Sequence, residues 1–155
     1  MKYIGMYLLV FTLGLVFPAR AGAQVPVTQD QPLVNQYIAD SYEHRSAAWW
    51  NALGRQLTLS VDVPYAQVRE AALQNIIFFA THHGQKVKLN DAAPTLLAIY
   101  QHHDQVAFRM MALAALHAIG DEDAMQTLNR IVEDEASDRV RHVTVAALHD
   151  HYYRQ

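Results

Sequence analysis

The stretch Phe-Arg-Met-Met-Ala-Leu-Ala-Ala-Leu-His-Ala-Ile-Gly, residues 108–120, contains a pattern that the chain repeats. A hydrophobic residue is followed by arginine, then by alanine at the fifth place, Ala-Leu at the eighth and ninth, and glycine at the end. Two further copies keep this frame and begin at Val68 and Val140, so the three starts lie 40 and 32 residues apart. This spacing is typical of helical hairpins that stack on one another.

The recurring apolar residues lie on one side of a helix, because they stand at positions i, i+4, i+7 and i+8. Small residues such as Ala112 and Ala115 let neighbouring helices approach closely, and Leu116 fills the space beyond them. One hairpin cannot cover this stripe alone, so the copies are expected to stack. The sequence therefore predicts an all-α fold, a short α-solenoid or α-α superhelix with an N-terminal helical cap. An ordinary helical bundle is the alternative.

The repeated phrase resembles the HEAT repeat, and in particular the bacterial HEAT-like variety associated with phycobilisome lyases. The first helix of that repeat reads Val-Arg, two free places, Ala, two free places, Ala-Leu and then Ile-Gly. The resemblance covers roughly residues 64 to 153. The last copy has Thr144 in place of alanine, and the first copy has Asn75 and Ala80 in place of alanine and glycine. The resemblance implies a stacked fold, and the lyase label carries no activity with it.

Residues 1–23 have the composition of an export signal. Lys2 provides the positive start, an apolar run follows from Tyr3 to Phe17, and small residues precede an expected cut after Ala23. An uncleaved anchor is the alternative, but an apolar run of roughly 15 residues is shorter than the ~20 that a spanning helix needs. We therefore expect an exported protein, periplasmic or secreted, with no stable membrane span once the signal is removed.

Composition excludes several classes of protein. The chain has no cysteine, so it cannot be a disulfide scaffold. Without residues 1–23 it carries 10 basic and 15 acidic residues, a net charge of −5 with neutral histidines, which disfavours nucleic acid as a partner. The remaining 132 residues suit one domain.

The chain divides into segments with different patterns. Residues 24–31 are polar and lack a helical period, which indicates a flexible lead. The pattern of residues 32–63 predicts an N-terminal helical segment and a linker. The helix is long or kinked over roughly 32–57, where Ser46 could cap a second piece, and the linker covers 58–63. Residues 64–155 form the repeat domain, with second helices over 92–101 and 123–133 and a last helix from about Asp138 to Tyr153.

Three arginines, Arg69, Arg109 and Arg141, occupy the same place in the three copies. We interpret them as structural residues, each holding a carboxylate or carbonyl group at a neighbouring turn, and Asp104, Asp121 and Asp138 are the candidate partners. The alternative is a basic strip for an anionic partner. The acidic run over 133–135 is interpreted as a solvated turn.

Histidine is unusually frequent, with close groups at 82–83, 102–103 and 149–151. Adjacent histidines on a helix point in different directions, so we expect helix capping and surface roles, no metal and no cofactor. Trp49 and Trp50 are interpreted as a cap on the open end of the stack, with one ring inward and the other partly exposed. A small-ligand or metal site built from the histidines and the Trp49–Trp50 region is the alternative.

No local catalytic pattern is present: the chain lacks a cysteine nucleophile, a Gly-x-Ser-x-Gly elbow and a phosphate loop. The sequence therefore predicts a non-catalytic scaffold or regulator that binds another protein in the cell envelope, on the concave side formed by the second helices. The contact candidates on that side are Gln101, His102, Gln126, Asn129 and Arg130. Tyr152 and Tyr153 on the exposed last helix also suggest a homodimer.

Overall fold

The structure is a computed structural model that describes residues 42–153. These residues belong to one compact unit, Ser41–Gln155. The expected export signal, the flexible lead and the start of the expected N-terminal helix lie outside the described residues.

The described part of the chain is built from helices joined by short turns, and it contains no strand. In chain order the elements are α2 (Ala47–Val61), α3 (Ala66–His83), the short 3-10 helix η1 (Asn90–Ala92), α4 (Ala93–His102), α5 (Val106–Ile119), α6 (Glu122–Ile131), the 3-10 helix η2 (Val132–Asp134) and α7 (Asp138–Tyr153).

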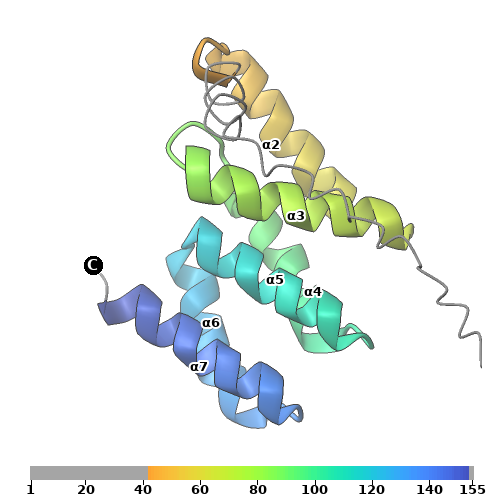
Figure 1. Cartoon of the computed structure of the whole chain (residues 1–155), viewed down its shortest axis with the longest axis vertical. Helices are drawn as coiled ribbons and strands as arrows, with labels where there is room; N and C mark the ends of the chain where they lie inside the picture. The colour runs from red at the N-terminus through yellow and green to blue at the C-terminus, as the bar shows by residue number, and fades with distance from the viewer. Residues whose placement is uncertain (1–41, 154–155) are drawn as a thin grey trace, which may run out of the picture. The chain divides into compact units, whose positions relative to one another are not determined.

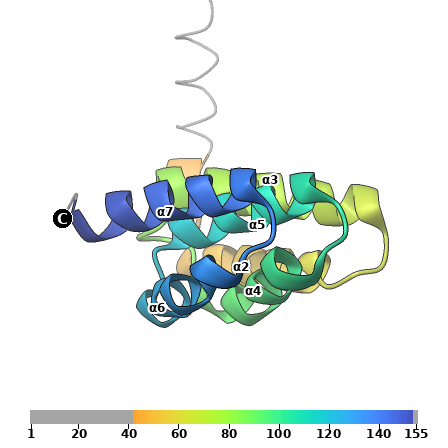
Figure 2. The ribbon, with the colours of Figure 1, turned by 90° about the horizontal axis from the view of Figure 1, so that it is seen from below.

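The helices form two layers, with α3, α5 and α7 side by side in one and α2, α4 and α6 in the other (Figures 1 and 2). Each helix of the first layer packs against the helix that precedes it in the chain, so the hairpins are α2–α3, α4–α5 and α6–α7. The sequence analysis instead expected two hairpins that each begin with an arginine-bearing helix, followed by a single last helix. In the structure α7 is paired with α6, and the stack holds three hairpins.

The seams between neighbouring helices are lined by the recurring small residues. Ala112 and Ala115 of α5 are fully buried, and Ala72 of α3 is 3 % exposed. Leu116 and Ile76, which follow these alanines in their copies, are also fully buried. Close helix approach through alanine with a larger side chain beyond it gives a continuous core across the repeats. The expected all-α solenoid of stacked hairpins is confirmed.

The segment before the first repeat differs from expectation. The chain leaves a helix at His44, and α2 begins after Ser46, whose hydroxyl accepts a hydrogen bond from the Trp49 N–H at 3.2 Å. The helix then continues through Gly54 to Val61, so residues 58–61, expected as a linker, are helical. Gly54 does not end the helix. It is buried where α2 meets the backbone of Lys88, and a Cβ atom at this position would lie 2.4 Å from the Lys88 carbonyl oxygen.

Candidate functional site

The three arginines of the repeat phrase bind the chain where it leaves the preceding helix. Arg69 donates from Nε to the Val61 carbonyl at 3.1 Å and from Nη2 to the Val63 carbonyl at 2.9 Å. Arg109 donates from Nε to the Tyr100 carbonyl at 2.9 Å. A guanidinium group satisfies carbonyl oxygens that a helix C-terminus leaves without intrahelical partners.

The third arginine makes the same kind of contact. Arg141 donates from Nη1 to the Glu135 carbonyl at 2.8 Å, and its Nη2 pairs with the carboxylate of Asp138. Of the three aspartates expected as arginine partners, only Asp138 is one. Asp121 instead caps α6 by accepting a hydrogen bond from the Ala124 N–H at 3.0 Å.

Glu135 is the acidic partner that the sequence analysis missed. Its carboxylate is ion-paired with Arg109 and accepts a hydrogen bond from the Ser137 N–H at 2.7 Å. Burial alone would raise the pKa of Glu135, but the hydrogen bonds from Arg109 and Ser137 outweigh burial and hold the pKa below its ordinary value. The expected solvated turn is therefore half wrong: Glu133 and Asp134 are exposed, whereas Glu135 is 8 % exposed.

Two open depressions lie at successive junctions between hairpins, near the C-terminal ends of α2, α4 and α6. The first has a volume of about 240 Å³ and is lined by Val61, Asp62, Arg69, Thr95, Ala98, Ile99, His102 and His103. The second has a volume of about 250 Å³ and is lined by Tyr100, Gln101, His102, Ile131, Asp134 and Glu135. His102 lines both. We call them the paired depressions.

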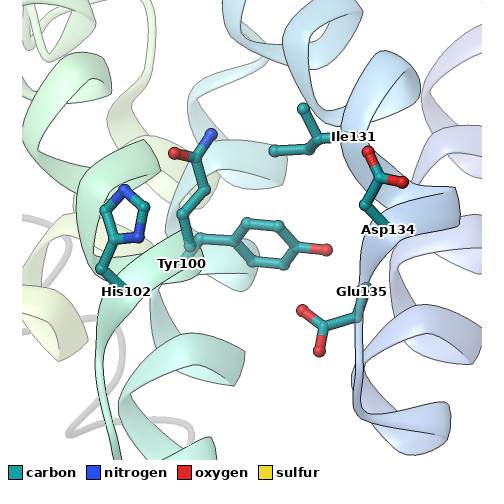
Figure 3. Close-up of a pocket in the computed structure, with 6 residues that line it drawn as sticks. Tyr100, His102, Ile131, Asp134 and Glu135 are labelled. Atoms are coloured by element: carbon teal, nitrogen blue, oxygen red, sulfur yellow. The ribbon is translucent and has the colours of Figure 1, made fainter.

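Figure 3 shows how the second depression is built from two hairpins. His102 stands on the α4 side, Ile131 and Asp134 stand on the opposite side, and the Tyr100 ring reaches across from α4. The Tyr100 ring is 1 % exposed, and burial raises the pKa of its hydroxyl above the ordinary value, against the opposing effect of a hydrogen bond to Thr144. The floor of the depression is therefore buried, whereas His102 and Asp134 on the rim are exposed.

A sequence profile described as HEAT repeats matches residues 55–149. The chain belongs to the HEAT-repeat family. The match runs from the second half of α2 into α7 and includes all three arginines of the repeat phrase. No curated protein and no solved structure matches the chain.

Two of the five residues expected to contact a partner line the paired depressions of this HEAT stack. Gln101 borders the second depression and His102 borders both. The other three, Gln126, Asn129 and Arg130, are exposed on α6 and line neither of them. Arg130 donates to the hydroxyl of Thr127 at 2.9 Å, within its own helix. The sequence analysis missed Asp62 and Asp134, because the hydrophobic period alone does not show which turn residues border a junction.

The histidines of the HEAT stack serve several separate contacts. His117 on α5 lies 3.1 Å from a carboxylate oxygen of Asp150 on α7, and His151 on α7 lies 3.2 Å from Glu122 on α6. His103 accepts a hydrogen bond from the Gln105 N–H at 3.1 Å, in the turn after α4. Within residues 42–153, no three His, Asp or Glu side chains come together in a group that could hold a metal ion.

The aromatic residues at the first HEAT hairpin pack on one another around His83. Trp50 is 3 % exposed, and its ring lies 5.2 Å from that of His83 and 6.1 Å from that of Phe79. Trp49 is partly buried, and Arg45 lies over its ring at 5.2 Å. One ring inward and one partly exposed is the arrangement expected for a cap on the stack.

No helix of the HEAT stack within residues 42–153 is both long enough and apolar enough to cross a bilayer.

Proposed function

We propose that this HEAT-repeat protein is an exported, non-catalytic scaffold or regulator that binds another protein of the cell envelope in the paired depressions. HEAT repeats generally mediate protein–protein interaction, and the chain matches them over residues 55–149. The charged start, apolar run and small residues of positions 1–23 support export.

The observation that carries this proposal is the recurrence of one surface feature at successive repeat junctions. Neighbouring helices pack about 8–10 Å apart, so adjacent depressions are separated by about that distance. Residues i and i+3 of a polyproline II segment share one side and lie about 9 Å apart, and residues i and i+7 of a helix share one side and lie about 10 Å apart. Two side chains from one segment of a partner can therefore enter both depressions together.

The rim indicates the chemistry of those side chains. Each depression is bordered by one exposed aspartate, Asp62 in the first and Asp134 in the second. The arginine in the first depression, Arg69, already donates to two carbonyl groups. The partner is therefore expected to carry hydrogen-bond donors or basic side chains at the two matching positions.

The test is affinity purification of the protein from an envelope extract of cells that express the full sequence. His102→Lys places a positive charge at both depressions at once, and Asp134→Lys reverses the charge at one rim. We expect both variants to lose a partner that the wild-type protein retains. His44→Lys, at an exposed histidine before α2, is the matched control and should retain it.

Arg130→Glu separates this surface from the outer face of α6. If Arg130→Glu loses the partner while His102→Lys and Asp134→Lys retain it, the partner binds the face of α6 and the paired depressions are not the site.

A further inference from the structure

The last helix presents an outward face that no described residue covers. We call it the α7 end face, and it consists of residues three or four positions apart, which share one side of a helix. Its members are Asp138, His142, Val145, His149 and Tyr152. All five are exposed, and Val145 is 52 % exposed.

The repeat register shows what kind of surface this is. Leu73 of α3 and Leu113 of α5 occupy the same place in their copies as Val145 does in α7. Leu73 is fully buried and Leu113 is 2 % exposed, in helices that pack against the next helix of the layer, α3 against α5 and α5 against α7. The α7 end face is therefore a repeat seam that no described helix covers, and a helix of similar size and polarity fits it.

We propose that a second copy of this chain covers the α7 end face, in an antiparallel two-fold dimer. The face is complementary to itself, because it has a carboxylate acceptor near one end and an imidazole donor near the other. Asp138 near its start and His149 near its end are eleven residues apart, or about 16 Å along the helix. A two-fold axis that passes between His142 and Val145 sets Asp138 of each copy against His149 of the other, so one contact is made twice.

Both members of this contact are available. The Asp138 side chain is 85 % exposed although it pairs with Arg141, so oxygen lone pairs remain for a second donor. The His149 ring is stacked on that of Tyr153, with centroids 4.7 Å apart, which restricts its rotation. Val145 of each copy then packs near the axis, against His142 of the other.

The size of the face sets the strength of the dimer. A helix of 16 residues is about 24 Å long, and one helix packed on another buries less than the about 1,600 Å² of a standard interface. The dimer is therefore weak and depends on concentration. None of its residues lines the paired depressions, so dimerisation and partner binding are independent.

Sedimentation velocity over a concentration series tests the proposal, on protein recovered from cells that express the full sequence. Wild-type protein should pass from monomer to dimer. Val145→Arg should weaken the dimer at least about tenfold, because it places two like charges near the axis. The matched control is Val68→Arg, at a valine of α3 that is 44 % exposed, and it should dimerise as the wild type does.

Two results of this series would overturn the proposal. One is a monomer at every wild-type concentration. The other is loss of association in Val68→Arg as well as in Val145→Arg, because that pattern shows head-to-tail stacking through α3 in place of a two-fold contact.

A charge exchange tests the register directly. Asp138→His and His149→Asp should each weaken the dimer by up to about tenfold, because each removes both Asp138–His149 contacts. The double variant restores the pairs in reverse and should recover the wild-type dissociation constant within about threefold. A double variant as weak as the singles contradicts the pairing. Thermal melting shows whether each variant is folded. If Val145→Arg does not fold, the charge exchange between positions 138 and 149 is the deciding test.

Discussion

The hydroxyl groups of Tyr100 on α4 and Thr144 on α7 lie 2.9 Å apart in the buried core. Thr144 donates its own proton to the Val140 carbonyl at 2.8 Å, so the Tyr100 hydroxyl is the donor between the two side chains. Both residues are at most 1 % exposed. The repeat phrase has alanine at this place, and the exception in the third copy provides the acceptor that a buried tyrosine needs.

Replacing Thr144 by Ala should therefore destabilise the protein although it restores the repeat consensus. The Tyr100 hydroxyl would keep its burial and lose its acceptor, at a cost of about 1–3 kcal/mol. Tyr100→Phe should cost less, and the double variant should cost less than the sum of the two single variants. Chemical denaturation of the four proteins measures the coupling.

Thr58→Ala is the control for this cycle. Thr58 also donates to the carbonyl four residues earlier, that of Gly54, at 3.0 Å. Its effect should be small and additive with Tyr100→Phe. Additive effects of Thr144→Ala and Tyr100→Phe would show that the buried contact contributes no coupling energy.

Glu135 should make stability depend on pH in the acid range. Its folded-state pKa lies below the ordinary value of 4.5, because the bonds from Arg109 and Ser137 outweigh burial. The ionised carboxylate therefore stabilises the fold above pH 4.5, and this contribution is lost as the pH falls through the folded-state pKa. Melting temperatures of wild type and Glu135→Gln should converge toward low pH.

Arg109, which is ion-paired with Glu135, offers the complementary test. Arg109→Ala should cost about 3 kcal/mol, because it leaves a buried carboxylate without its counter-ion. Arg139→Ala, at an exposed arginine of α7, should change stability by less than about 0.5 kcal/mol. Equal small effects of the two substitutions would contradict a structural role for the arginine of the repeat phrase.

His83 should report acidification through the neighbouring Trp50. Burial, with added effects of Lys86 and His82, lowers the pKa of His83 below 6.5. The folded state therefore favours the neutral His83 ring. The free energy of unfolding decreases as the pH falls from 6.5 through the lowered pKa of His83. Because the two rings lie 5.2 Å apart, the imidazolium should quench tryptophan fluorescence, with a midpoint below pH 6.5.

His83→Phe should remove that fluorescence transition, and His142→Asn, at an exposed histidine of α7, should keep it. A midpoint at or above pH 6.5 in the wild-type protein would contradict the closed aromatic packing around His83.

Gly54→Ala should destabilise the protein even though alanine favours a helix interior by about 1 kcal/mol. The added Cβ would lie 2.4 Å from the Lys88 carbonyl oxygen, so α2 or the loop before η1 must shift. Gly120→Ala is the comparison. Gly120 has φ of +67° and open space around it, so an added Cβ atom there meets no other atom and the substitution costs only backbone strain. If Gly54→Ala melts at or above the wild-type temperature, α2 does not approach the loop this closely.

The repeat phrase was sufficient to predict the stack, because burial of a stripe with i, i+4, i+7 spacing leaves few other arrangements. It did not predict which helices pair, since a hairpin can begin at either helix of a periodic array. The linker expected over 58–63 is helical as far as Val61, and the close approach of Lys88 explains a glycine inside α2. Glu135 was placed among solvated charges because sequence alone does not show that Arg109, 26 residues earlier, turns toward it.

The surface was harder to predict than the core. His102 was selected from helical phase, and the structure places it between two depressions. Asp62 and Asp134 gave no signal, because they lie in turns, and a turn residue borders a junction only through the packing of whole hairpins.

Site-specific photo-crosslinking in living cells tests most directly whether the protein binds a partner through the paired depressions. A photoreactive amino acid in place of His102 should form one discrete adduct with another protein, and the same group in place of His44 should not. No adduct from position 102, or the same adduct from both positions, would contradict binding at this surface.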